Sequence, residues 1–312
     1  MQIAVLLATY NGETYIKELL DSLINQTFQD FVCYIHDDGS TDRTIEIVEE
    51  YSIQYPERFR ILDYPPTGAA KANFMSLLKQ ISEPYAMFCD QDDVWNQEKI
   101  EISYKAIRKA EKRYPGQPIL CFGDMKVVDS QLNTIDMSFF KYTGLDPNRT
   151  ELRQLLVENV VAGCTTIMNQ KLYSSASELK EYSHIQMHDL WIALVAAATG
   201  KIIYINRPLL LYRQHESNVK GAEKNKNIFF KALSVLKKVF SGEYIEKTRK
   251  WHSTFRYQAY ELSKVHDVSK DICVFLREFC ELDKKNKIER ILFYKRHHIE
   301  RKKHSLWMLL WC

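Results

Sequence analysis

Glycine and proline are scarce in this chain of 312 residues, which contains 10 Gly and 8 Pro. Such low contents exclude collagen-like and low-complexity chains, and a hydrophobic share of 46% is high enough to bury a core. No uncharged apolar run approaches the roughly 18 residues that a membrane-spanning helix needs, since residues 190–199 reach only about half that length. We therefore expect a soluble globular protein with one catalytic domain and an appended segment.

The sequence also lacks the signals of export and of cysteine-based sites. The first apolar run, residues 3–8, is too short for a signal peptide and has no basic residue before it. The seven cysteines are odd in number and form no CxxC pair, which favours neither a disulfide framework nor a zinc site. Buried thiols in a cytoplasmic protein are expected.

Charge is unevenly divided along the chain. Residues 1–219 carry 21 Lys and Arg against 29 Asp and Glu, a net charge of −8. Residues 220–312 carry 22 against 11, a net charge of +11, so the whole chain has +3. An acidic half favours metal ions as partners, whereas a basic half favours phosphate-bearing surfaces such as anionic lipid or nucleic acid.

Short apolar runs alternate with amphipathic stretches over the first 130 residues or so. This alternation is typical of a mostly parallel β-sheet with helices on both faces. The expected strands are 3–7, 31–36, 59–62, 85–89 and 119–123, and the expected helices are 13–26, 42–53, 69–81 and 97–113. In such sheets ligands bind beyond the carboxyl ends of the strands, so the residues that follow each strand are the candidates for a site.

Acidic residues follow two of these strands. Residues 37–42 (DDGSTD) come after the second strand, where ordinary turn chemistry explains them about as well as a site does. Residues 90–93 (DQDD) come after the fourth strand, and three carboxylates so close together repel one another unless a cation neutralises them. Carboxylate oxygens from one short segment suit Mg²⁺ or Mn²⁺. The glycine-rich signatures of Rossmann and P-loop sites are absent, so we expect a diphosphate held through a metal.

Three ordered motifs resemble the family 2 glycosyltransferases of the GT-A fold: residues 7–12 (LATYNG), 36–42 (HDDGSTD) and 90–95 (DQDDVW). This resemblance implies a GT-A catalytic domain over residues 1–220, followed by a helical region over 221–312. It also implies an enzyme that transfers a sugar, with inversion and with a divalent metal, from a nucleotide diphosphate to an acceptor hydroxyl.

Two later motifs, residues 187–191 (MHDLW) and 212–219 (YRQHESNV), are similar to the bacterial rhamnosyltransferase branch of that family. The similarity implies cell-surface polysaccharide synthesis, with L-rhamnose from dTDP-rhamnose as an example of the donor. The acceptor would be a lipid-linked saccharide or a polysaccharide.

The family resemblance assigns a donor side to the site. Thr9, Tyr10 and Asn11 would line the nucleoside pocket, and Asp38 would accept a hydrogen bond from the imide N–H of uracil or thymine. Asp90 would face the ribose.

The resemblance assigns the diphosphate and metal side as well. Asp92, the second acid of the D-x-D pattern, would bind Mn²⁺ or Mg²⁺. His215 would complete the metal shell or contact the diphosphate, with a structural histidine as the alternative. Asp93 and Arg213 would support these ligands from behind. Lys71 would touch the diphosphate, with a solvated lysine in the first turn of a helix as the alternative.

Asp189 matches the family position of the catalytic base, which removes the proton of the acceptor hydroxyl. A helix N-cap before the apolar run is the alternative role for this residue, and the two roles are compatible. His188 and Trp191 would contact the acceptor sugar, although a tryptophan in an apolar helix is at least as often a core residue. Members of the family more often have an aromatic residue at position 190, where this sequence has leucine.

Amphipathic helical patterns replace the strands after residue 228. We expect helices at 228–240, 244–266, 268–282 and 286–299, preceded by a mobile loop over 216–227 that closes on the donor. Residues 284–304 carry nine Lys and Arg against two Glu, and an apolar cluster (LWMLLW) follows at 306–311. This composition predicts that residues 284–312 bind the inner face of the cell membrane, whereas 228–282 pack on the catalytic domain.

Two other functions were weighed. A nucleic-acid-binding module would use the basic half of the chain, but the acidic residues beyond the strands argue against it, so no nucleic-acid partner is expected. A non-catalytic binder of sugar nucleotides is disfavoured because every carboxylate position of the family pattern is filled.

Overall fold

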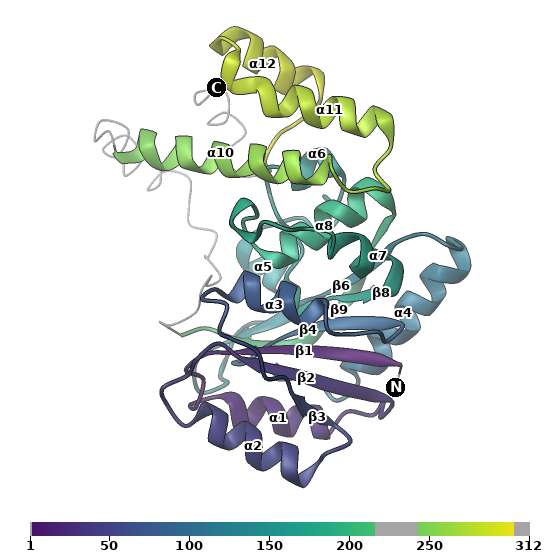
Figure 1. Ribbon diagram of the computed structural model, residues 1–312, viewed down its shortest axis with the longest axis vertical. Helices are drawn as coiled ribbons and strands as arrows, with labels where there is room; N and C mark the ends of the chain where they lie inside the picture. The colour runs from purple at the N-terminus through teal and green to yellow at the C-terminus, as the bar shows by residue number, and fades with distance from the viewer. Residues whose placement is uncertain (1, 216–242, 303–312) are drawn as a thin grey trace.

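A mixed β-sheet flanked by helices dominates the computed structural model, which describes residues 2–215 and 243–302 (Figure 1). Nine strands of the described residues form this sheet, in the order β3-β2-β1-β4-β8-β6-β9-β5 with β7 paired to β6. The strands are β1 (Ile3–Thr9), β2 (Phe31–Asp37), β3 (Phe59–Ile61), β4 (Tyr85–Asp90), β5 (Val94–Trp95), β6 (Ile119–Val128), β7 (Thr134–Asp136), β8 (Ile167–Asn169) and β9 (Lys201–Arg213).

The parallel half of the sheet follows the predicted alternation. Strand β1 lies between β2 and β4 and is parallel to both, and β2 is parallel to β3. Helices α1 (Ile16–Ile24), α2 (Thr44–Gln54), α3 (Ala70–Leu78) and α4 (Lys99–Arg113) connect these strands. The core residues of β1 have no exposed surface on either face, as expected for a strand covered on both sides. The prediction for residues 1–123 is thus confirmed, with boundaries that shift by a few residues.

The other half of the sheet was not predicted. Strand β8 is antiparallel to both β4 and β6, and β9 runs parallel to β6 and antiparallel to the short β5. The pairing of β5 with β9 brings the end of β9 beside the loop that follows β4. Long-range pairings of this kind have no signature in the local sequence, because they depend on which strands meet after the chain folds.

Helix α8 (His188–Thr199) lies in the centre of the core on one face of the sheet. Nine of its twelve residues are buried, and its sequence is apolar all round, as expected of a helix enclosed by other elements. Helices α5 (Phe139–Thr143), α6 (Leu152–Leu155) and α7 (Gln170–Ala176) and the short 3₁₀ turns η1 (Gly163–Thr165) and η2 (Tyr182–His184) complete this part of the chain.

The C-terminal region is helical, as predicted (Figure 1). Its described elements are α10 (Glu243–Leu262), α11 (Lys270–Cys280), η3 (Glu281–Lys284) and α12 (Lys287–Arg296). The helix expected at 228–240 and the loop expected at 216–227 lie outside the described residues, as do Trp307 and Trp311. In the described part of the chain, no helix is long and apolar enough to cross a membrane.

Helix α12 packs on the protein through one face, and the expectation that residues 284–312 bind the membrane stays a prediction. Phe293 and Tyr294 are buried against Phe275 and Phe279 of α11. The end of the described chain is also held, since the backbone N–H of Lys302 donates to the Glu158 carboxylate at 3.1 Å. The apolar face of α12 is therefore used for folding, and only its outer face remains exposed.

Candidate active site

A cavity of 1420 Å³ opens where β1, β2 and β4 end. The register of the sheet sets Thr9 beside Asp37 and Ala8 beside Asp90, so the carboxyl ends of the three strands lie side by side. Nine of the predicted site residues line the cavity: Thr9, Tyr10, Asn11, Asp38, Asp90, Asp92, His188, Asp189 and His215. The predicted convergence of motifs on one edge of the sheet is therefore observed.

The loop after β1 is shaped by side chains from the two neighbouring strands. The Gln91 amide binds the backbone of Tyr10 twice, accepting from its N–H at 2.8 Å and donating to its carbonyl at 2.9 Å. Asn11 has a left-handed backbone (φ 46°), and its side chain accepts from the N–H of Thr41 at 2.8 Å. These bonds leave the Tyr10 ring exposed over the cavity, with 57% of its surface accessible.

The two acids at the end of β2, Asp37 and Asp38, have different neighbours. The Asp37 carboxylate accepts hydrogen bonds from the Thr9 hydroxyl at 2.7 Å and from the Ser40 N–H at 2.7 Å. Asp38 lines the cavity and accepts from the Thr67 hydroxyl and the Gly68 N–H at 3.0 and 3.2 Å. Asp37 thus serves the turn, whereas Asp38 is the acid that borders the cavity.

The side chains of Asp92 and His215 lie next to each other at the cavity wall, although the residues are 123 positions apart in the sequence. The Nε2 atom of His215 lies 2.8 Å from Oδ2 of Asp92, and the two side chains are 12% and 18% exposed. The Tyr15 ring packs on the imidazole, with centroids 4.8 Å apart. A carboxylate and an imidazole at this distance can share one divalent cation.

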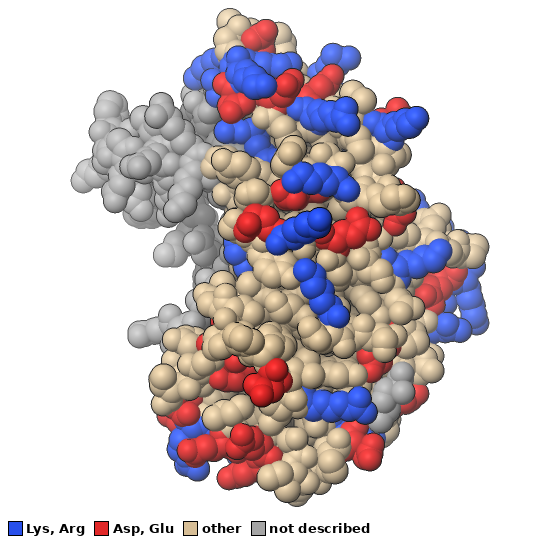
Figure 2. All heavy atoms as spheres, viewed as in Figure 1, with Lys and Arg blue, Asp and Glu red and all other residues tan. Residues whose placement is uncertain are grey.

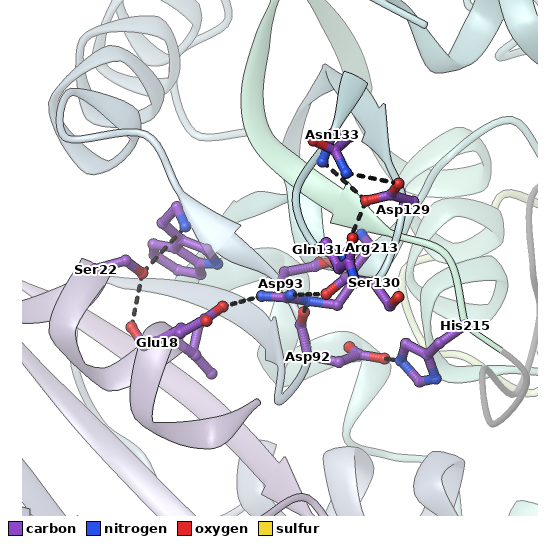
Figure 3. A network of polar contacts seen from close by, with 12 residues as sticks. Glu18, Ser22, Asp92, Asp93, Asp129, Ser130, Gln131, Asn133, Arg213 and His215 are labelled. Carbon is purple, nitrogen blue, oxygen red and sulfur yellow. Dashed lines mark hydrogen bonds and ion pairs between the residues drawn. The ribbon is translucent and has the colours of Figure 1, made fainter. Parts of the chain in front are cut away.

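Arg213 organises this pair from behind (Figure 3). Its guanidinium is 2% exposed, donates to the main-chain oxygens of Asp92 at 2.9 Å and Ser130 at 2.7 Å, and forms an ion pair with Glu18. Its Cζ atom lies 4.4 Å from the centroid of the Tyr15 ring. A planar group with several donors is suited to fixing several acceptors at once. Arg213 thus holds the backbone of Asp92, and its role in the reaction stays a prediction.

Two further acids crowd behind Asp92. Asp93 is buried, and Asp90 lines the cavity. Burial, and then the charges of Asp92 and Asp189, raise the pKa of Asp90 to about 7. Burial, and then the charges of Asp92 and Asp90, raise the pKa of Asp93. Both shifts have the sign expected for carboxylates withdrawn from water beside like charges.

Asp189 lies in the first turn of α8 and lines the cavity. The N-cap of this helix is Met187, so the alternative role of Asp189 as the cap is wrong. A carboxylate in the first turn is still favoured by the positive end of the helix dipole. Asp189 and Asp90 line the same cavity, and the charge of Asp189 contributes to the raised pKa of Asp90.

His188 is packed between aromatic rings rather than displayed to solvent. It is 4% exposed, and its ring centroid lies 4.0 Å from that of Phe74 and 4.7 Å from that of Phe88. Gly163 passes directly beneath it, because a β-carbon at position 163 would lie 2.8 Å from Nε2 of His188. His188 therefore forms a wall of the cavity, and Gly163 is required for the close approach.

Two predicted site residues lie elsewhere. Trp191 has no exposed surface, and its indole N–H donates to the Ala176 carbonyl at 2.9 Å, so a platform for the acceptor sugar is wrong and the core role holds. The Nζ atom of Lys71 donates to the Ile185 carbonyl at 2.7 Å and does not line the cavity. Packing partners supplied by distant segments decided both positions.

The structure adds residues that the sequence did not indicate. Residues 159–164 form a wall of the cavity, and Met125 contacts the Cys164 thiol with the sulfur atoms 3.6 Å apart. Lys99 is fully buried behind the acidic motif. A lysine in the first turn of an amphipathic helix is normally solvated, so no local signal distinguishes this one.

Comparison with known proteins identifies the family. Residues 4–174 match the model of glycosyl transferase family 2. The chain is 32% identical over 234 residues to the dTDP-rhamnosyl transferase RfbG of Shigella flexneri, an alignment that covers 72% of this chain and 76% of RfbG.

Solved structures share the fold. The Staphylococcus aureus protein TarS (residues 1–349, with UDP-GlcNAc) superposes with a TM-score of 0.57 at 20% identity, over 95% of this chain and 80% of that chain. The mannosyltransferase PcManGT of Pyrobaculum calidifontis, with GDP-Man and Mn²⁺, gives a TM-score of 0.52 at 12% identity, over 99% and 78%. The fold is the GT-A fold with a helical C-terminal region, and the chain belongs to glycosyl transferase family 2 and is a glycosyltransferase.

Proposed function

We propose that this enzyme binds a nucleotide-diphosphate sugar together with one divalent cation in the 1420 Å³ cavity. The observation that carries the proposal is the pair formed by Asp92 and His215, 2.8 Å apart on the cavity wall. The TarS and PcManGT structures named above contain nucleotide sugars, and the latter also contains Mn²⁺.

The ligand chemistry favours Mn²⁺, with Mg²⁺ as the alternative. An oxygen and a nitrogen ligand from the protein leave further positions for water and phosphate oxygens, and Mn²⁺ accepts nitrogen more readily than Mg²⁺ does. Asp90, Asp93 and Cys164 also bring ligand atoms within 4.8 Å of one another. That group offers a soft thiol and a buried acid, so we assign the cation to Asp92 and His215. When bound, such a cation would neutralise charge on the diphosphate.

The nucleoside would lie over the end of β1, where Thr9, Tyr10 and Asn11 line the cavity. The exposed Tyr10 ring provides a face on which a base can pack, and Asp38 borders the same space. A carboxylate at this position would accept a hydrogen bond from the imide N–H of uracil or thymine. Asp90 would face the ribose.

The transfer itself is proposed to be a single displacement with inversion. Asp189 would remove the proton of the acceptor hydroxyl as that oxygen attacks the anomeric carbon of the donor sugar. The bond between the anomeric carbon and the diphosphate oxygen would break, and the diphosphate would leave with the bonding electrons. This role is supported by the position of Asp189, which lines the same cavity as Asp90 and Asp92.

The similarity to RfbG, a dTDP-rhamnosyl transferase, favours dTDP-rhamnose as the donor and L-rhamnose as the transferred sugar. A thermal-shift screen would compare dTDP-rhamnose, UDP-glucose, UDP-galactose and UDP-GlcNAc, each with Mn²⁺ or Mg²⁺. We expect the largest rise in Tm with dTDP-rhamnose and Mn²⁺, because a ligand that binds only the folded state stabilises it. A larger rise with a UDP-sugar would contradict the donor, and a rise that persists in EDTA would contradict the metal.

The acceptor is proposed to be a lipid-linked or polymeric saccharide in cell-surface polysaccharide synthesis, reached from the inner face of the membrane. The outer face of α12 supports this location. Ile288 and Leu292, one turn apart, are 71% and 59% exposed, and Lys287 and Lys295 are exposed beside them. Blue Lys and Arg side chains are numerous over this end of the molecule (Figure 2). Apolar residues among cations are suited to an anionic lipid surface.

A further inference from the structure

Lys99 has no exposed surface, although lysine is one of the residues most rarely buried. Its Nζ atom donates to the main-chain oxygen of Cys164 at 2.5 Å and lies 3.0 Å from the centroid of the Trp95 ring. Burying an ammonium ion is unfavourable unless neighbouring groups compensate for the lost water. The position therefore requires compensating groups, and the structure supplies them.

The compensating groups include the acidic motif. Burial lowers the pKa of Lys99 to about 8, whereas the nearby Cys89 and Cys164, and then Asp93 and Asp90, act in the opposite direction. Trp95 belongs to β5, which pairs with β9 at Leu210 and Leu211, shortly before Arg213 and His215. The ammonium is thus placed against the strand pair β5 and β9, which adjoins the proposed metal ligands.

The carbonyl that Lys99 holds belongs to the segment between the acidic motif and the proposed base. The Cys164 sulfur and carboxylate oxygens of Asp90 and Asp93 lie within 4.8 Å of one another. On its other side the segment touches α8, because a β-carbon at Gly163 would lie 3.3 Å from Cβ of Asp189. Residues 162–165, one turn of chain, therefore lie between the acidic motif and Asp189.

We propose that Lys99 is a positioning residue for sugar transfer, which fixes residues 162–165 through the Cys164 carbonyl and thereby sets Asp189 relative to the acidic motif. The role of Asp189 in this statement rests on the proposed function. A displacement of about 1 Å in a reacting group can cost on the order of a hundredfold in rate, so one hydrogen bond at this place has a large effect.

Three variants test the proposal. Lys99→Met keeps an unbranched side chain that is one atom shorter and removes its charge, and Lys99→Arg keeps a charge that does not titrate in the working range. Lys79→Met is the matched control, because Lys79 also donates to a main-chain carbonyl (Leu179, 3.2 Å) and lies over an aromatic ring (Tyr182, 4.9 Å). Lys79 is exposed and does not line the cavity.

Hydrogen exchange in the protein without ligands tests the positioning and does not depend on the donor. The N–H groups of Thr165 and Thr166 donate to the Ala162 and Gly163 carbonyls at 3.0 Å, so they report on this turn. We expect their exchange to be at least about tenfold faster in Lys99→Met and unchanged in Lys79→Met. Unchanged exchange in Lys99→Met would overturn the proposal, even if sugar transfer is lost.

Kinetics with the donor selected by the thermal-shift screen test whether the loss of the Lys99 contact slows sugar transfer. In Lys99→Met we expect kcat to fall at least about tenfold while the Kd for dTDP with Mn²⁺ stays within about threefold. Wild-type kcat should also fall above about pH 8, and this fall should move to higher pH in Lys99→Arg. An unmoved high-pH fall, or equal kcat losses in Lys99→Met and Lys79→Met, would overturn the proposal. If the wild type transfers no sugar, the proposed function fails, and hydrogen exchange still decides the role of Lys99.

Discussion

The cavity and the C-terminal helices use charge in opposite ways. Around the cavity, charged groups are buried: Lys99, Arg213 and Asp93 have at most 2% of their surface exposed. In the C-terminal helices, aromatic residues such as Phe279 form the interior and most of the charged residues are exposed. Burying charge costs free energy unless partners compensate for it. Buried charge is concentrated around the cavity, whereas in the described C-terminal helices Glu261 is a buried acid, at 7% exposed.

One buried ionic group joins the two regions. Glu158 is 5% exposed and lies near the guanidinium groups of Arg149 (3.6 Å) and Arg301 (3.7 Å). Asn159, the next residue, lines the cavity. Residues 301 and 302 thus contact Glu158, next to the cavity wall formed by residues 159–164, and Lys99 binds the same wall at Cys164. The C-terminal region therefore supports the cavity wall and also has an exposed outer face.

Asp92→Ala should produce the largest effect, because it removes a proposed metal ligand from the cavity. We expect transfer to fall at least about a thousandfold and Mn²⁺ binding to be lost, with Tm nearly unchanged since the removed carboxylate repels its neighbours. Steady-state kinetics and Mn²⁺ titration measure this. The matched control is Glu281→Ala, an exposed acid of the C-terminal region, which should retain full activity. Wild-type activity that survives EDTA would contradict the prediction.

Asp189→Asn should produce the next largest effect. Turnover should fall at least about a hundredfold, the scale of general-base catalysis, because the amide cannot accept the hydroxyl proton. The Kd of the nucleotide measured by calorimetry should change little, since the proposed nucleoside contacts come from other lining residues, Thr9 to Asn11 and Asp38. Retained turnover in this variant would mean that the base lies elsewhere.

The pH dependence of metal binding should show an intermediate effect. The pKa of Asp90 is raised to about 7, so its proton opposes the cation below that pH. We expect Mn²⁺ affinity to rise about tenfold per pH unit up to pH 7 and then to level off, as expected where one proton is released on binding. The raised pKa also means that Asp90 contributes stability at acid pH, which is lost as pH rises towards 7.

Mn²⁺ should accordingly raise Tm more at pH 8 than at pH 5.5. Asp90→Asn serves as the control, because it removes the titrating group and should flatten the pH dependence. A slope that persists in this variant would show that another group releases the proton.

The outer face of α12 should show the smallest effect. The double substitution Ile288→Ser with Leu292→Ser should weaken binding to anionic vesicles by at least about threefold and leave kcat for a soluble acceptor unchanged, since these side chains are exposed and outside the cavity. Ile53→Ser is the control, because Ile53 is 80% exposed on α2 of the catalytic region. Vesicle sedimentation measures the binding. Equal binding to neutral and anionic vesicles would contradict an electrostatic contribution.

Local sequence was enough to predict the parallel strands, the helices between them and the three motifs at their ends. Period and composition encode these features, because each element must bury its own apolar face. The same reasoning predicted Asp38, Asp90 and Asp92 at one edge, since the carboxyl ends of parallel strands share that edge. Asp189 and His215 were assigned to the site by the family resemblance alone. It also predicted three of the described C-terminal elements, α10, α11 and α12.

Tertiary structure alone decided which side chains face the cavity and which support it. Trp191 and Lys71 have plausible sequence positions for a site, but their partners, Ala176 and Ile185, come from segments that reach them only in the folded chain. Lys99 appears in the sequence as an ordinary helix lysine, and becomes a buried cation because β5, η1 and the acidic motif enclose it. Burial, distance and hydrogen bonding depend on contacts between remote segments, which no local pattern of residues specifies.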